Sequence, residues 1–272
     1  MPLCFKLKVQ SNVPLEVEGI TPDVTRAISL AEVEKLVMFQ GNVKLPLAEF
    51  FSVSGSGDDE RHEWDGDLAG VHWLGTKMKS GRIDVLDSIG RHLGSEMSGG
   101  EIHVAGDASD WVGAEMHGGL IHVRGRAGHL VGSAYRGSAK GVTKGTILIG
   151  GDAGNEIGLS MRRGLIAIGG NAGDLIGMNM LAGSVFAFGT TGIRHGAGMK
   201  RGTLAFLSEA PPLLPTFRRA CRYRPEYLAV VYRRLRQQGF AVPEELMTAM
   251  YDLYCGDLIE GGRGEILIRT AN

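Results

Sequence analysis

The chain has 272 residues, of which 42 are glycine, and its acidic and basic residues nearly cancel to a formal charge of −1. This balance gives little reason to expect nucleic acid as a partner, and the isolated thiols Cys4, Cys221 and Cys255 indicate neither a disulfide framework nor a zinc or iron–sulfur site. No signal-like segment opens the sequence and no apolar run approaches the roughly 18 residues that span a membrane, so we expect a cytoplasmic protein without a membrane partner.

Residues 1–61 predict a small N-terminal cap of mixed α and β structure. Residues 5–9 and 50–53 have the composition of strands, and a short helix is expected near 29–38. Ser29 is the expected N-cap of that helix, and Glu32 completes a capping box. Such a cap would cover the unpaired strand edge at one end of the repeats that follow.

A repeat of nineteen residues occupies 62–207. One set of glycines keeps this interval, apart from one seven-residue stutter: Gly81, Gly100, Gly119, Gly145, Gly164, Gly183 and Gly202. A second set keeps the same interval: Gly75, Gly94, Gly113, Gly132, Gly158, Gly177 and Gly196. Three residues after each glycine of the second set comes a large side chain: Met78, Met97, Met116, Tyr135, Met161, Met180 and Met199. Self-similarity at a fixed period indicates stacked units that share one core.

Within each unit the apolar residues alternate as they do in a strand. They stand at the second and fourth places after the first glycine, as Ile83 and Val85 do. Further glycines follow at the corners, where positive φ angles are needed. The predicted fold is therefore all-β: a parallel β-helix of about seven coils, with the Ile/Val and Met side chains inside. A left-handed hexapeptide helix and a calcium-binding nonapeptide roll both require other periods.

Two features interrupt the regular pattern. The stutter adds residues 138–144, which we expect to loop outward, as a partner contact or as an insertion without a role. Outward-facing positions of the later coils carry Leu148, Ala167 and Phe186, where the earlier coils carry polar residues. This apolar outer patch must be covered, either by a terminal segment of the chain or by another subunit.

Residues 208–272 predict a helical extension that ends in a strand. Helices are expected at 225–238, with Pro225 at the first position and Gly239 as the stop, and at 243–255, stopped by Gly256. Residues 265–270 have the pattern of a last strand.

No set of residues in the sequence forms a convincing catalytic or metal centre. Asp84, His103 and His122 would stack on adjacent coils with the spacing of half a metal site, but side chains in register on an exposed face are more commonly solvated. His195 replaces the isoleucine of the preceding coils and stands next to Arg194. It is either an exception at the end of the core or a polar contact to a partner or an anionic ligand.

Basic residues recur just before the unit boundary. The register would align them at one edge: Lys79, Arg136, Arg162, Arg163, Lys200 and Arg201. Tandem guanidinium groups suit carboxylates and phosphates, whereas charge runs commonly belong to solvated faces. The candidate contacts to an anionic cofactor or partner are Arg162, Arg163, Arg194, His195, Lys200 and Arg201.

The repeat resembles a known family. Residues 102–119 (IHVAGDASDWVGAEMHGG), 147–164 (ILIGGDAGNEIGLSMRRG) and 166–183 (IAIGGNAGDLIGMNMLAG) are similar to the coils of the C subunit of formylmethanofuran dehydrogenase, a family that includes the C subunit of the bacterial formyltransferase/hydrolase complex. The ending GDLIEGGRGEILIR is similar to the C-terminus of this subunit. A more distant relative is the glycine-repeat domain of the glutamate synthase large subunit.

The resemblance implies a right-handed β-helix that assembles with an amidohydrolase-like subunit and a formyltransferase subunit in one-carbon metabolism. The bacterial complex moves a formyl group onto a methanofuran-type carrier and hydrolyses it to formate. We expect the bacterial complex. The alternative is the archaeal enzyme, which reduces CO2 with tungsten or molybdenum and iron–sulfur clusters on other subunits. The family supplies no catalytic motif to carry onto this chain, which implies a structural subunit that binds no cofactor alone. The carrier has a glutamyl tail, and the basic residues could hold it. A domain supporting an ammonia tunnel, as in glutamate synthase, is the alternative from another class.

Overall fold

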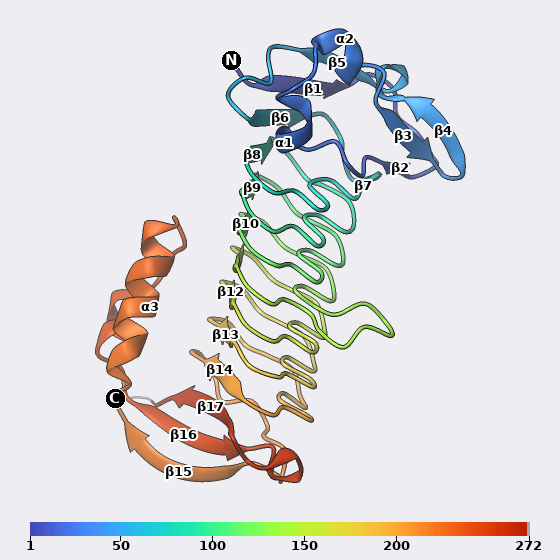
Figure 1. Cartoon of the computed structure of the whole chain (residues 1–272). Helices are drawn as coiled ribbons and strands as arrows, with labels where there is room; N and C mark the ends of the chain where they lie inside the picture. The colour runs from blue at the N-terminus through green and yellow to red at the C-terminus, as the bar shows by residue number, and fades with distance from the viewer. Residues whose placement is uncertain (271–272) are drawn as a thin grey trace.

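A computed structural model describes residues 1–270, and most strands join one thirteen-stranded sheet (Figure 1). Its central strands are all parallel and follow one another in chain order: β8 (Arg82–Val85), β9 (Glu101–Val104), β10 (Leu120–Val123), β11 (Thr146–Ile149), β12 (Leu165–Ile168), β13 (Ser184–Ala187) and β14 (Gly202–Phe206). The chain winds once between each strand and the next, and Figure 1 shows these windings stacked along the molecule.

Like residues lie above like residues in this stack. Ile83 pairs with Ile102, Ile102 with Ile121, and Ile121 with Ile147 on the far side of the stutter. A second series of parallel bridges, through Ile89, Ala108 and Ala127 and then from Ala153 onward, joins the windings at another side. The nineteen-residue interval of the sequence is therefore the length of one winding.

The interior of the stack is an apolar column. The predicted Ile/Val positions are fully buried, and so are the six methionines of the repeat. Their thioethers reach over the glycines of the next winding. A Cβ atom at Gly145, where φ is +110°, would lie 2.7 Å from the Cε atom of Met116. Glycine at this position thus gives both the backbone angle and the room for the methionine.

The stutter departs from the prediction. Tyr135 does not enter the column but lies half-buried on the outside, and Val142 is the fully buried residue at the inner place. Three backbone hydrogen bonds hold Val142 there: its N–H donates to the Gly132 carbonyl, and its own carbonyl accepts from the N–H groups of Arg162 and Arg163. Residues 136–140 and Lys144 are therefore exposed, whereas Gly141 and Val142 of the predicted outward loop 138–144 are buried.

The N-terminal residues extend the sheet and add a second one. Strand β1 (Leu3–Leu7) pairs in parallel with β6 (Arg61–Asp65), which adjoins β8, and antiparallel with β5 (Phe51–Ser54). The second sheet has the order β4 (Val43–Pro46), β3 (Val37–Gln40), β2 (Leu15–Glu16), β7 (Val71–His72). The short helical segments are α1 (Pro22–Thr25), α2 (Leu30–Val33) and the 3₁₀ turn η1 (Leu47–Glu49).

The capping box of α2 is confirmed, because the Glu32 carboxylate accepts from the backbone N–H and the hydroxyl of Ser29, each at 2.7 Å. The helix is shorter than predicted, since the following residues form the β3–β4 hairpin.

The C-terminal residues contain more strand than predicted. The helix expected at 225–238 is α3 (Glu226–Gln237), but the helix expected at 243–255 is wrong: this segment is the 3₁₀ turn η2 (Glu244–Met247) followed by strand β16 (Tyr251–Gly256). Strand β16 lies between β15 (Arg218–Tyr223) and β17 (Gly264–Arg269), with the turn η3 (Leu258–Glu260) before β17. Ladder bonds to two neighbours outweigh the helical tendency of the segment. The predicted last strand, β17, pairs in parallel with β14 and so continues the stack.

Helix α3 packs over the outer face of the parallel sheet (Figure 1). Leu148, Ala167 and Phe186 are buried under Leu228, Tyr232 and Leu235 of the helix. The prediction that a terminal segment covers the apolar outer patch is thus confirmed. In residues 1–270, no helix combines the length and apolar character that a membrane span requires.

The buried methionines yield a stability prediction. Replacing Met116 with alanine leaves a cavity in the column, and we expect the free energy of unfolding to fall by about 2–5 kcal/mol. Met250→Ala is the matched control, because Met250 lies at the surface and should change stability by less than about 0.5 kcal/mol. Denaturant unfolding followed by circular dichroism measures both. Equal effects of the two substitutions would contradict the buried column.

Candidate functional site

Three strands at one end of the stack begin with the same dipeptide. Arg163–Gly164, Arg201–Gly202 and Arg263–Gly264 precede or open β12, β14 and β17. Because the strands are parallel and in register, their preceding turns lie at one edge of the sheet. This arrangement brings together arginines that are about 100 residues apart in the chain.

These turns enclose a basic hollow of about 300 Å³. The hollow is lined by the following residues: Arg162, Arg163, Leu181, Ala182, Lys200, Arg201 and Arg263. Leu181 and Ala182 belong to the winding between the two basic pairs, so they form an uncharged floor. The basic pairs are two windings apart, which is about 10 Å at the usual strand spacing.

The charge of the basic hollow is largely uncompensated. Among residues 1–270, Arg162, Arg163, Arg201 and Arg263 form no ion pair, and Lys200 has only a distant contact, with its Nζ 3.8 Å from a carboxylate oxygen of Glu260. Guanidinium groups with free N–H donors bind carboxylates and phosphates in a forked geometry. The lining contains no nucleophile or general base, so the chemistry it supports is the holding of an anion.

Four of the six predicted contacts meet in the basic hollow, and sequence reasoning missed the fifth cation, Arg263. Its signal is the motif Arg-Gly followed by alternating apolar residues, which opens β12 as RGLIAI, β14 as RGTLAF and β17 as RGEILI. Reading β17 as one more unit of the stack, with Gly264 paired to Gly202, places Arg263 beside Arg201.

The other two predicted contacts lie elsewhere. Arg194 is exposed at a corner, with a φ of +63°. His195 is buried, and both its ring nitrogens are used: Nδ1 accepts from the Ile176 N–H at 3.2 Å and Nε2 donates to the Gly192 carbonyl at 2.9 Å. In the preceding windings the corresponding carbonyls, such as that of Gly173, accept from the next corner. At Gly192, the last of these corners, the His195 ring donates the hydrogen bond that a backbone N–H of the following corner donates in earlier windings.

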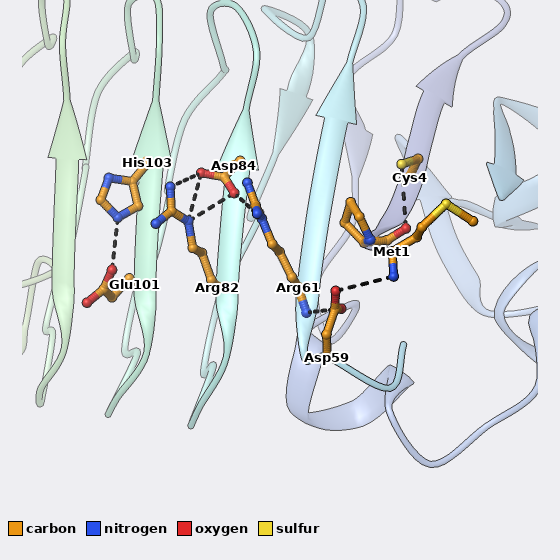
Figure 2. Close-up of polar contacts among 9 residues, drawn as sticks. Met1, Cys4, Asp59, Arg61, Arg82, Asp84, Glu101 and His103 are labelled. Carbon is orange, nitrogen blue, oxygen red and sulfur yellow. Dashed lines mark hydrogen bonds and ion pairs between the residues drawn. The ribbon is translucent and has the colours of Figure 1, made fainter. Parts of the chain in front are cut away.

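The polar residues of the early windings are held by their neighbours. Figure 2 shows Asp84 between two arginines, with the Arg61 Nε 2.8 Å and the Arg82 Nη2 2.6 Å from its carboxylate. His103 turns to Glu101 at 3.0 Å, and His122 is buried at the edge of the segment that follows α3. Within the described part of the chain, no group of His, Cys, Asp and Glu side chains is arranged to hold a metal ion.

A stack of aromatic rings on another corner was also missed. Trp73 and His92 lie parallel at 3.9 Å, Trp111 follows, and the Tyr135 ring packs on Trp111 at 4.8 Å. The Tyr135 hydroxyl lies 2.9 Å from His92 Nδ1 and donates to Ser95 at 2.8 Å. The nineteen-residue interval between Trp73, His92 and Trp111 was the available signal, and the stack explains why Tyr135 leaves the interior.

Comparison with known proteins gives two kinds of match, and no family model matches the chain. The C subunit of the molybdenum-containing formylmethanofuran dehydrogenase 1 of Methanothermobacter marburgensis is 41% identical over 87 residues, which are 32% of this chain and 22% of that protein. The C subunit of the tungsten-containing formylmethanofuran dehydrogenase 2 of Methanothermobacter wolfeii is 36% identical over 90 residues, 32% of this chain and 33% of that protein. The matches thus span about a fifth to a third of these relatives.

The structural match covers nearly the full length of both chains. One chain of the formyltransferase/hydrolase complex from Methylorubrum extorquens, crystallised with methylofuran, superposes with a TM-score of 0.88. The superposition covers 98% of this chain and 100% of the other, at 28% sequence identity.

The buried histidine predicts a pH dependence of stability. Burial lowers the pKa of His195 from its usual 6.5 to about 4. Only the unfolded chain then takes up a proton as the pH falls below 6.5, so stability is lost between pH 6.5 and 4 and this contribution levels off below. We expect His195→Gln, which cannot titrate, to remove about 3 kcal/mol of this loss. Urea unfolding at pH 7.5, 6 and 4.5 measures it. Identical pH profiles of both proteins would refute the buried neutral ring.

Proposed function

Because the chain belongs to the family of formylmethanofuran dehydrogenase C subunits, we propose that it is the structural subunit of a formyltransferase/hydrolase complex. In this proposal the windings are the right-handed parallel β-helix that the resemblance implies. The complex moves a formyl group onto a methanofuran-type carrier and hydrolyses it to formate, with the reacting groups on an amidohydrolase-like subunit and a formyltransferase subunit.

The observation that carries the proposal is the full-length superposition on a chain of the Methylorubrum extorquens complex. The sequence matches to the molybdenum and tungsten enzymes cover only part of each protein. This contrast favours the formyltransferase/hydrolase branch over the metal-dependent dehydrogenases. Any metal of such a complex would belong to other subunits.

A structural role is supported by how the polar groups of this chain are used. His195 and Asp84 are bonded within the chain, and the basic hollow supplies cations without a nucleophile or a base. The chain's own contribution to the chemistry is then to join the other subunits and to hold an anionic group. In our proposal the anionic group is the glutamyl tail of the carrier, held by Arg162, Arg163, Lys200 and Arg201 together with Arg263.

Reconstitution tests the structural role. The partner subunits are prepared with and without this chain, and complex mass, formyl transfer and hydrolysis of the formyl carrier are measured. We expect the subunits to separate without this chain and coupled turnover to fall at least about tenfold, because the reacting sites are no longer held together. The chain alone should show no hydrolysis. Hydrolysis by the isolated chain, or unchanged turnover in its absence, would overturn the proposal.

Charge reversal tests the basic hollow. Replacing Arg162, Arg163, Lys200 and Arg201 with glutamate should weaken retention of the carrier by the complex at least about tenfold, since attraction becomes repulsion. The matched control reverses four exposed basic residues outside the hollow, namely Lys35, Lys44, Lys140 and Arg233, and should leave retention unchanged. Carrier co-purifying with each complex is quantified by mass spectrometry. Intact retention with lost subunit docking would identify the hollow as a protein contact instead.

A further inference from the structure

A second depression lies between the windings and the segment that follows α3. This α3 groove has a volume of about 590 Å³, within the range of small-molecule sites. Its apolar surface is formed mainly by Phe188, Leu207, Phe240 and Leu246, over a floor of Gly150 and Gly169. It does not overlap the basic hollow, because the two share no lining residue.

The floor of the α3 groove is open for a backbone reason. Successive windings place Arg124, Gly150, Gly169 and Phe188 in one column after their strands. A Cβ atom at Gly150 would lie 2.3 Å from the carbonyl oxygen of Arg124, and one at Gly169 would lie 2.4 Å from that of Gly150. Side chains are therefore excluded over two windings, about 10 Å, between an arginine at one end and a phenylalanine at the other.

The outer wall of the groove is held in place by specific contacts. The Arg236 guanidinium donates through Nε and Nη2 to the Val242 carbonyl, at 3.1 and 2.7 Å, and through Nη1 to Glu244 at 2.6 Å. The Phe240 ring packs edge-on against Phe188 with centroids 5.2 Å apart. A groove with a fixed wall loses little entropy when a ligand enters.

The charge in the groove favours an anion. Glu245 is the only acidic group among the described lining residues, and Arg269 faces it at 3.9 Å. Arg124 is exposed and, within residues 1–270, has no ion-pair partner. Burial lowers the pKa of the adjacent His122 to about 4, so this ring is neutral at pH 7. The uncompensated cation thus stands at the Arg124 end, next to an apolar floor.

We propose that the α3 groove binds a small amphipathic carboxylate. The apolar body, the size of one aromatic ring with a short chain, lies over Gly150 and Gly169 against Phe188 and Phe240. The carboxylate meets the guanidinium of Arg124, which has donors free for a forked contact. This inference is independent of the proposed function, since it concerns a site on the chain itself and requires no partner subunit.

Titration of the isolated full-length chain with 4-phenylbutyrate tests the proposal, with 4-phenylbutylamine as the probe of opposite charge. We expect one molecule of the acid to bind and the amine to bind at least about tenfold more weakly, because Arg124 attracts one charge and repels the other. Isothermal titration calorimetry at low salt measures both. Absence of binding by the acid, or equal binding of the amine, would overturn the proposal.

Three variants locate the bound acid. Arg124→Gln removes the cation and should weaken binding about tenfold. Ala241→Trp, at an exposed lining position, should fill the groove and abolish binding. Arg126→Gln is the matched control, because Arg126 is an exposed arginine of the same winding that pairs with Asp107 outside the groove, and it should bind like the wild type. Thermal melting checks that each variant is folded. Unchanged affinity in both Arg124→Gln and Ala241→Trp would place the acid elsewhere and refute the site.

Discussion

Backbone hydrogen bonds between successive windings are the constraint on which the rest of this structure depends. They hold residues nineteen apart directly above one another, so each position of the repeat becomes a column running along the molecule. The inward columns are therefore apolar and buried and several corner columns are glycine, whereas outward columns change from polar to apolar along the stack. Because neighbouring windings share the column of isoleucines and methionines, no winding could bury its apolar side chains alone.

The columns also form the two surfaces for which binding is proposed, the basic hollow and the α3 groove. Two basic dipeptides, 162–163 and 200–201, lie two windings apart and together form one cluster of positive charge. The apolar pair 181–182 lies between them. A glycine repeated in two windings becomes the open floor of a groove. The outer face of the later strands is apolar and is covered by α3. The α3 groove lies between the windings and the segment that follows this helix. Charge and shape at the surface therefore follow from which residue stands at which place in the period.

The periodic part of the fold was predictable from the sequence because glycine, isoleucine and methionine each mark a fixed place in the winding. The segments outside the repeat were harder to predict from the sequence. The prediction of a helix at 243–255 followed the local helical tendency of the sequence. Pairing with β15 on one side and β17 on the other makes Tyr251–Gly256 a strand instead. Val142 replaces Tyr135 in the column because an insertion can be placed in more than one way within a loop, and packing selects among them. Arg263 joins the basic cluster through a pairing of β14 with β17, which depends on a contact of long sequence separation.

Lengthening the stack tests the register most directly. One variant duplicates residues 82–100, a full winding next to the N-terminal strands, and the other inserts a single alanine between Ile83 and Asp84. A whole winding keeps every column intact, whereas one extra residue turns inward side chains outward for the rest of that strand. Measured by denaturant unfolding, the duplication should retain a cooperative transition near wild-type stability, and the single insertion should lose several kcal/mol or fail to fold. Equal tolerance of the two insertions would contradict the account.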